Sequence, residues 1–254
     1  MLKKEFNILL TAIMFYTRIP VPESVGYSPD MLNKATRYFP LIGLLVGGLG
    51  AGVFMGLNCI LHQNIAVILA LSFMVLLTGA FHEDAFADFC DGFGGGYTSD
   101  KILSIMKDSR IGTYGAVGLG LLLITKYALL SGIPVKDLPL LLISAHVFSR
   151  LVAVCLIFSS QYVGNPDNSK SKPVGEKKSQ LTFIIASVTG IAPLFLLNFT
   201  SVVFILLIQI LIFLYFRYYI HKKINGYTGD VLGALQQISE VAFYLSFMVI
   251  TSNQ

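Results

Sequence analysis

The sequence is poor in charge, and this shortage excludes several classes of protein. Charged residues make up 13% of the 254 residues, and the mean hydropathy is +0.73. Because a soluble domain is about one quarter charged, the composition excludes a disordered protein, a nucleic-acid-binding protein and most soluble folds. We therefore expect no nucleic-acid partner. The net charge of +4 arises from scarce acids rather than from a basic patch, so it says little about other partners.

Cysteine and tryptophan are also scarce. The three cysteines, Cys59, Cys90 and Cys155, are odd in number and widely spaced, so they show neither disulfide nor metal-site spacing. There is no tryptophan, so anchoring at the membrane surface falls to tyrosine, lysine and arginine. No internal repeat is visible, which disfavours a transporter built from repeated halves.

Long apolar runs predict an all-α integral membrane protein. A transmembrane helix needs roughly 20 mainly apolar residues, and a soluble domain of this length could not hide so much apolar surface. We expect a single domain over residues 1–254, a polytopic bundle of about seven transmembrane helices. The runs are residues 39–61, 66–81, 114–133, 138–159, 179–216, which polar residues 198–201 divide into two, and 231–250.

The N-terminal segment, residues 6–16, is apolar but short. Glu5 and Asn7 interrupt the stretch that follows Lys3 and Lys4, so we expect no cleaved signal peptide. The segment is either an eighth span or a short helix that lies at the membrane interface or forms a re-entrant hairpin, and the placement of the charged residues favours the second.

Charged segments alternate with uncharged turns along the chain, as seven spans require. By the positive-inside rule the charged segments face the cytoplasm. One of these segments, residues 160–179, is expected to be a mobile cytoplasmic loop. The charged segments are residues 18–37, 82–112, 160–179 and 217–230.

Small residues recur at helical spacing in the first apolar run. This spacing allows close packing of helices in a membrane. The partner is either another helix of the chain or a second copy in a homo-oligomer, and the sequence leaves both open. The residues are Gly43, Gly47, Gly48, Gly52 and Gly56.

Residues 82–112 form the predicted cytoplasmic loop, which is acidic and is expected to bind metal and carry the catalytic residues. They hold six of the 14 acidic residues of the chain. Asp84, Asp88 and Asp91 follow i, i+4, i+7 spacing, which places three carboxylates on one helix face. A divalent cation removes their mutual repulsion, and hard oxygen ligands suit Mg²⁺ or Mn²⁺ beside a substrate phosphate. A solvated acidic loop is the alternative.

Three other motifs are candidate substrate contacts. Residues 107–110, Lys-Asp-Ser-Arg, place two cations around an acid, which suits a diphosphate or an ordinary salt-bridge cluster. Glycines at residues 92–96 allow close approach to a phosphate or a flexible turn. Residues 226–230 open the last helix, with Thr228 as a helix N-cap and Asp230 as a candidate substrate contact.

Three ionisable residues, Lys126, Arg150 and Glu240, lie within apolar runs. Each is costly in lipid and should face a polar cavity or a partner. They predict contacts to an anionic substrate, or a structural ion pair such as Arg150 with Glu240. The residues together predict a membrane enzyme that transfers a phosphoryl group with a divalent metal.

Several ordered motifs resemble the cobalamin synthase family, the adenosylcobinamide-GDP ribazoletransferases. The resemblance extends over the whole chain, with Ala85-Phe86 where the family usually has Gly-Leu. The motifs are FYTRIPVP, RYFPLIGLLVGG, FHEDAFADFCDGFGG, MKDSRIGTYG and GYTGDVLGALQQISE.

The resemblance implies that Mg²⁺-dependent transfer joins adenosylcobinamide-GDP to α-ribazole or its 5′-phosphate. The products are adenosylcobalamin or its phosphate, and GMP. The implied metal ligands are Asp84, Asp88 and Asp91. Candidate catalytic residues are Asp84, His82, Arg110, Lys126 and Arg150, and candidate substrate-binding residues are Lys107, Asp108, Ser109, Thr228, Gly229, Asp230 and Glu240.

The hypothetical mechanism is attack by the ribazole 3′-hydroxyl on the phosphorus attached to cobinamide. Asp84 or His82 accepts the hydroxyl proton, and cations offset the developing charge. The alternatives are a CDP-alcohol phosphotransferase, a prenyltransferase or, less favoured, a transporter. Against the first, this sequence lacks the Ala-Arg that follows the leading Asp-Gly in those enzymes. Against the second, this sequence lacks a second aspartate-rich motif, because Asp230 stands alone.

Overall fold

The computed structural model describes residues 2–23, 25–26, 28–164 and 178–251, so most of the expected mobile loop, residues 160–179, lies outside the described residues. Within that part of the chain the fold is helical, and one isolated bridge joins Tyr162 to Tyr227. The elements are α1 (Leu2–Tyr16), α2 (Pro29–Ala35), η1 (Thr36–Tyr38), α3 (Phe39–Asn58), α4 (Gln63–Thr78), α5 (Phe81–Gly95), α6 (Ser99–Met106), α7 (Thr113–Gly132), α8 (Leu138–Ser159), α9 (Gln180–Ile191), η2 (Ala192–Leu196), α10 (Phe199–Ile224) and α11 (Gly229–Thr251).

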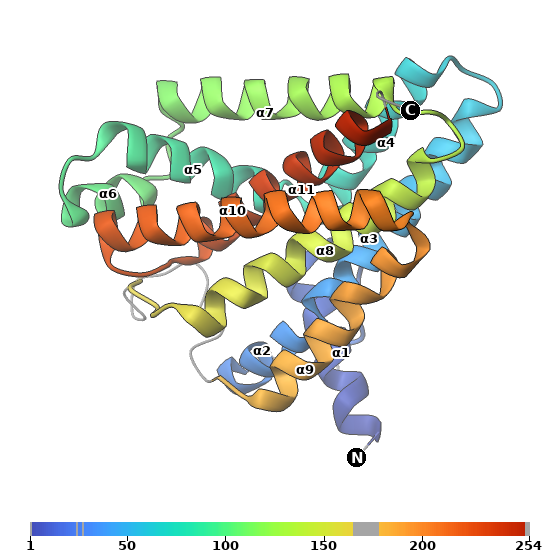
Figure 1. Cartoon of the computed structure of the whole chain (residues 1–254). Helices are drawn as coiled ribbons and strands as arrows, with labels where there is room; N and C mark the ends of the chain where they lie inside the picture. Colours follow the sequence, from blue (N-terminus) through green and yellow to red (C-terminus); the bar gives the residue numbers. More distant parts are fainter. Residues whose placement is uncertain (1, 24, 27, 165–177, 252–254) are drawn as a thin grey trace.

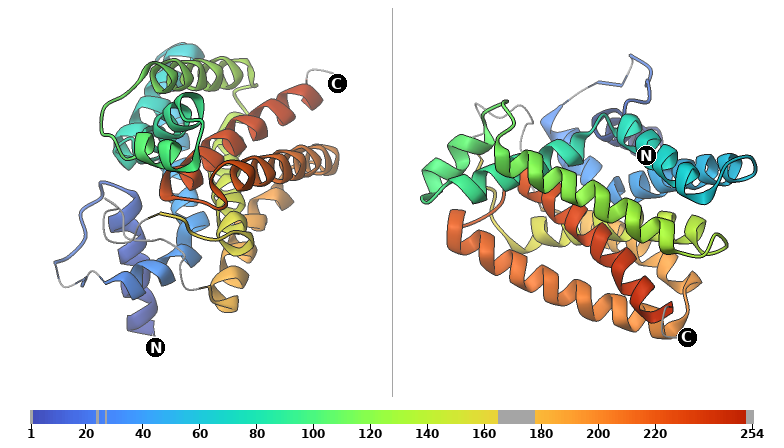
Figure 2. Two further views of the ribbon diagram at one scale, coloured as in Figure 1. Left: turned by 90° about the vertical axis from the view of Figure 1, so that its left-hand side faces the viewer. Right: turned by 90° about the horizontal axis from the view of Figure 1, so that it is seen from above.

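Helix α8 forms the centre of the bundle and contacts α3, α9 and α11. In its most apolar stretch 83% of the residues are buried, compared with 22% in α10 and 28% in α7. Figures 1 and 2 show α7 at one end of the molecule and α1, α2 and α9 at the other. The apolar outer faces of α7 and α10 are therefore the surfaces that lipid covers.

The structure confirms a polytopic helical membrane fold but not seven spans. Among the described residues five helices are long and apolar enough to cross a membrane, or six if the bent pair α4–α5 counts as one. Polar residues 198–201 divide the long apolar run as predicted. However, α9 and η2 together form an apolar helix of only Gln180–Leu196, about 25 Å long, which is shorter than a hydrocarbon core of about 30 Å.

A sharp break separates α4 from α5. Gly79 and Ala80 both adopt left-handed backbone conformations, with φ values of 66° and 58°, and the two helix axes are bent by 87°. Added bulk at Gly79 would overlap the side chain of Arg18, whose backbone N–H donates to Leu77 O at 2.7 Å. The break therefore starts a separate helix at Phe81 and turns its first residues into the protein.

The N-terminal helix α1 docks on α2 and η1. Glu5 accepts hydrogen bonds from Tyr38 Oη at 2.8 Å and Arg37 Nη1 at 3.0 Å. The Tyr38 hydroxyl and the Arg37 charge hold the pKa of Glu5 below its ordinary value. Arg37 also reaches Thr182 of α9 at 3.5 Å, so one cluster ties three elements together.

The glycine spacing in α3 serves two faces. A Cβ at Gly43 or Gly47 would overlap the backbone of α8, whereas a Cβ at Gly48, Gly52 or Gly56 would have no atom of the described residues within 4 Å. The first two glycines therefore explain the close approach of α3 to α8. The other three form an open outer face, and for them a partner copy stays a prediction.

We expect Gly43→Ala to destabilise the protein by about 1–3 kcal/mol, because the added methyl group overlaps the carbonyl of His146 and overpacking is costly. The matched control is Gly52→Ala in the same helix, which should melt at or above the wild-type temperature since alanine favours helix. Thermal unfolding in detergent measures both. Equal melting temperatures would contradict the packing role of Gly43.

Candidate functional site

Residues 82–112, expected as a loop, instead form α5, α6 and their connection to α7. Asp84, Asp88 and Asp91 lie in one continuous helix, as their spacing predicts. They differ in environment, because Asp84 is exposed, Asp88 is half-buried and Asp91 is buried. The three predicted metal ligands are therefore not equivalent.

Asp91 caps the beginning of α7. Its carboxylate accepts backbone N–H bonds from Gly112 at 2.7 Å and from Gly115 at 2.8 Å. A Cβ at either glycine would overlap this carboxylate, so both positions leave room for it. Since a helix N-terminus presents unpaired N–H groups and a partial positive charge, Asp91 has a structural role whether or not it binds metal.

Asp84 and Asp88 fit a magnesium site better. Two carboxylates one helical turn apart are hard oxygen donors, and Mg²⁺ is usually held by one or two protein carboxylates plus substrate phosphates and water. In the described part of the chain no three His, Cys, Asp or Glu residues are grouped to hold a metal. The Mg²⁺ site stays a prediction, and it would need oxygen atoms of the substrate.

The Lys107–Arg110 segment lies on the surface between α6 and α7. The Arg110 side chain is 87% exposed and forms a two-pronged contact with Asp108, with Nη2 to Oδ2 at 2.6 Å and Nε to Oδ1 at 3.0 Å. The hydrogen bond and charge of Asp108 raise the pKa of Arg110. Lys107 and Ser109 are also exposed, so this segment is open to an anionic ligand.

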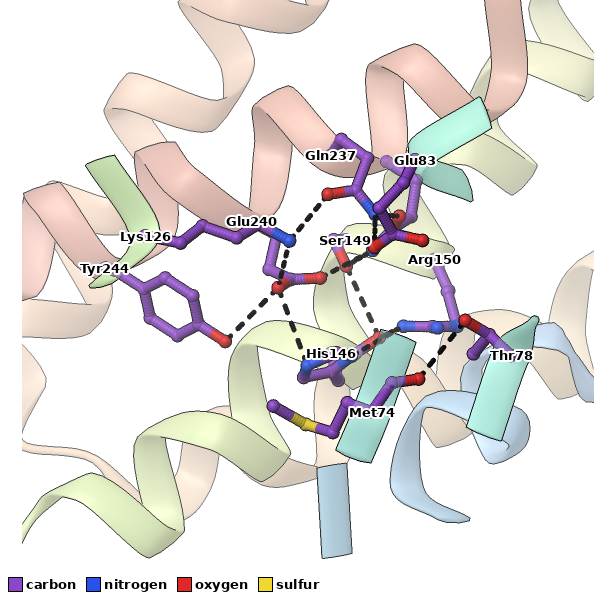
Figure 3. A network of polar contacts seen from close by, with 11 residues as sticks. Met74, Thr78, Glu83, Lys126, His146, Ser149, Arg150, Gln237, Glu240 and Tyr244 are labelled. Atoms are coloured by element: carbon purple, nitrogen blue, oxygen red, sulfur yellow. Dashed lines mark hydrogen bonds and ion pairs between the residues drawn. The ribbon is translucent and has the colours of Figure 1, made fainter. Parts of the chain in front are cut away.

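Lys126 and Glu240 form a buried ion pair between α7 and α11 (Figure 3). Lys126 Nζ donates to Glu240 Oε1 at 2.8 Å and to Gln237 Oε1 at 2.5 Å. Lys126 is 3% exposed and Glu240 is fully buried. Glu240 therefore forms a structural ion pair, as one of the two interpretations predicted, but its partner is Lys126 and not Arg150.

Arg150 lies deep in α8 with a different set of partners. Its Nη1 donates to His146 O at 2.8 Å and lies 3.1 Å from His146 Nδ1. Its guanidinium lies 5.5 Å from the centre of the Phe39 ring. No carboxylate among the described residues lies within 4.0 Å of its nitrogen atoms.

Two neighbouring amides complete the network and were missed from the sequence. Gln236 donates to Ser149 Oγ at 3.0 Å and to Glu240 Oε2 at 2.7 Å. Gln237 donates to Glu83 Oε1 at 3.1 Å. Two adjacent glutamines within the apolar run 231–250 were the available signal, because buried amides require partners. The network thus joins α5, α7, α8 and α11.

The network encloses a cavity of about 20 Å³, which has room for one water molecule. A phosphate group does not fit there. In this arrangement Lys126, Arg150 and Glu240 stabilise the interior, and the exposed acids of α5 and the Lys107–Arg110 segment are the groups that a substrate can reach.

The beginning of α11 lies against α5. Thr228 Oγ1 accepts from Val231 N at 3.4 Å, which confirms the predicted N-cap. A Cβ at Gly233 would overlap Ala85 Cβ, so this glycine allows α11 to lie close to α5. Asp230 is half-buried, one turn before this contact, which places the Thr228–Asp230 motif beside the acidic helix.

We expect Asp91→Ala to cost about 1–2 kcal/mol of stability, because α7 loses its cap. Asp91→Asn should cost less, since the amide oxygen still accepts an N–H bond. The control is Asp100→Ala, at an exposed position in α6. Thermal unfolding checks the order. A purely metal-binding role would instead leave the metal-free melting temperature of Asp91→Ala unchanged.

Comparisons with known proteins place this site in a family. A family model described as cobalamin-5-phosphate synthase matches residues 8–248. The chain is 47% identical to an adenosylcobinamide-GDP ribazoletransferase of Shewanella frigidimarina, over 97% of this chain and 96% of that protein. It is 41% identical to one of Vibrio parahaemolyticus, over 99% and 96%. No solved structure gives a significant match. The chain therefore belongs to the cobalamin-5-phosphate synthase family and is an enzyme of the transferase class.

Proposed function

We propose that this enzyme joins adenosylcobinamide-GDP to α-ribazole or α-ribazole 5′-phosphate and releases GMP. Family membership supports the nucleotide-loop assembly step of cobalamin biosynthesis, and the relatives' names supply the two reactants. The observation that carries the proposal is the short helix α5, which holds the family's acidic motif at an accessible surface while its other face packs into the core.

In the proposed reaction the ribazole 3′-hydroxyl oxygen forms a bond to the phosphorus attached to cobinamide. The bond from that phosphorus to the bridging oxygen breaks, and GMP leaves with that oxygen. Asp84 accepts the hydroxyl proton in this proposal, because it is exposed whereas His82 is 2% exposed and stacked beside Tyr16 and Phe39.

The accessible residues divide the remaining tasks. Asp84 and Asp88 would hold Mg²⁺, which supplies charge neutralisation for the diphosphate when bound. Lys107 and Arg110 would receive phosphate oxygens, with Asp108 and Ser109 orienting the segment. Thr228, Gly229 and Asp230, beside α5, would contact the second reactant.

The proposed location is the bacterial or archaeal cytoplasmic membrane, with α5 and α6 on the cytoplasmic side. The apolar helices support a membrane protein, and the charged segments 82–112 and 217–230 support this orientation by the positive-inside rule. This side would give the site access to nucleotide substrates. Assembly as a homo-oligomer through the open glycine face of α3 is part of the proposal.

We expect Asp84→Asn and Asp88→Asn each to lower kcat/KM by about 100-fold or more, while Asp100→Asn retains wild-type activity. The assay supplies both reactants to purified protein in liposomes and measures GMP and the corrinoid product by mass spectrometry. A chelator should abolish turnover and Mg²⁺ should restore it.

The outcomes separate the parts of the proposal. Full activity in Asp84→Asn would overturn the metal and base assignments and retain the reaction. Absence of product from folded, Mg²⁺-loaded wild-type protein would overturn the reaction itself. Release of CMP or inorganic diphosphate from other substrates would then identify a different transferase.

A further inference from the structure

Two buried ionisable side chains of the network have no ion-pair partner within 4.0 Å in the described part of the chain. Lys126 and Glu240 pair with each other, which leaves Arg150 at 1% exposure and Glu83 at 7% exposure. An uncompensated charge in a protein interior is strongly destabilising. With Glu83 ionised and His82 and His146 neutral, the charges of the four side chains sum to zero. Glu83 then offsets the charge of Arg150, as Glu240 offsets that of Lys126.

The unused atoms of this pair line one cavity. Among the described residues four buried atoms have no hydrogen-bond partner here, namely Arg150 Nε, Glu83 Oε2, His82 Nε2 and His146 Nε2. All four side chains line the cavity of about 20 Å³, which has room for one water molecule. Figure 3 shows Glu83 and Arg150 approaching this space from α5 and α8.

The chemistry of the lining selects water over an ion. Two cationic and two anionic side chains surround the cavity, so a further charge of either sign would meet a like charge. A water molecule can accept a hydrogen bond from Arg150 Nε and donate one to Glu83 Oε2. Its second hydrogen can be donated to His82 Nε2, and buried waters typically make about three such bonds.

We propose that one buried water molecule bridges Arg150 and Glu83 and that this bridge positions α5. Glu83 is then held from two sides, by Gln237 of α11 and through water by Arg150 of α8. Adjacent residues on a helix point about 100° apart, so fixing Glu83 fixes the direction of Asp84. Glu83 is thus a positioning residue, a role that rests on the proposed function, whereas the water bridge does not.

A double-mutant cycle tests the bridge without any activity measurement. We expect Glu83→Gln and Arg150→Gln each to lower the melting temperature in detergent by roughly 5–10 °C, because each leaves one buried charge unbalanced. The double variant should melt at least about 5 °C above the additive expectation, since it restores neutrality. If Arg150→Gln does not fold alone, recovery of folded protein on adding Glu83→Gln is the expected result.

A control and a direct observation complete the test. Gln209→Leu breaks the two buried hydrogen bonds between Gln209 of α10 and Ser239 of α11, neither of which involves α5, and should show additivity with Glu83→Gln. A density map that resolves ordered water should place one molecule within about 3.2 Å of Arg150 Nε and Glu83 Oε2. Additive losses in the cycle, or a direct Arg150–Glu83 contact in the map, would overturn the bridge.

Kinetics test the positioning role separately. Glu83→Gln should lower kcat more than it raises KM, because reactants still bind while Asp84 is misdirected, and Gln209→Leu should change neither. Unchanged kcat together with non-additive melting would retain the bridge and overturn positioning. Lack of turnover in the wild-type enzyme would overturn the proposed function and leave the melting and density results standing.

Discussion

The buried ion pair between Lys126 and Glu240 is the interaction on which the arrangement of this bundle depends. Charges within a low-dielectric interior are tolerated only when they are paired and hydrogen-bonded. Meeting that condition requires α7 and α11 to face each other at one depth and requires Gln236 and Gln237 to be satisfied as well. Partners on α5 and α8 satisfy them, so one polar requirement fixes four helices.

The break between α4 and α5 follows from the same polar interior. A continuous helix through Gly79 and Ala80 would carry His82, Glu83 and Asp84 along the axis of α4. The 87° bend instead turns Glu83 toward Gln237 and leaves Asp84 exposed. Non-helical backbone at membrane depth is tolerated where protein buries it, and here Arg18 covers the turn.

Hydropathy predicted most of the fold, because apolar runs of sufficient length have few alternatives in a membrane. It placed α3, α7, α8 and α11 to within a few residues and located the division before α10. It did not reveal the left-handed pair at Gly79 and Ala80, since an alanine in that conformation has no local signal. It also predicted a membrane span at α9, whereas the α-helix there ends at Ile191 and the 3₁₀ turn η2 follows it.

The sequence predicted those features of the candidate site that follow from residue type. It did not predict those that depend on which residue of another helix becomes the partner. The spacing of Asp84, Asp88 and Asp91 predicted a shared helix, but only the fold shows that Asp91 caps α7. The buried ionisable residues were correctly expected to have partners. Which cation would meet Glu240 depends on helix rotation, and sequence spacing carries no information about rotation between separate helices.

The cap at Asp91 has a mechanical consequence. Helix α5 is hydrogen-bonded to α11 near its beginning through Glu83 and to the start of α7 near its end through Asp91. Both ends of the helix are therefore fixed. The chain between Arg110 and Gly112 leads directly from the exposed surface segment to that cap. A ligand that shifts this segment would also shift α5 against the buried network. By reciprocity, a change in the hydrogen bonds of that network would change the affinity of the surface segment for the ligand.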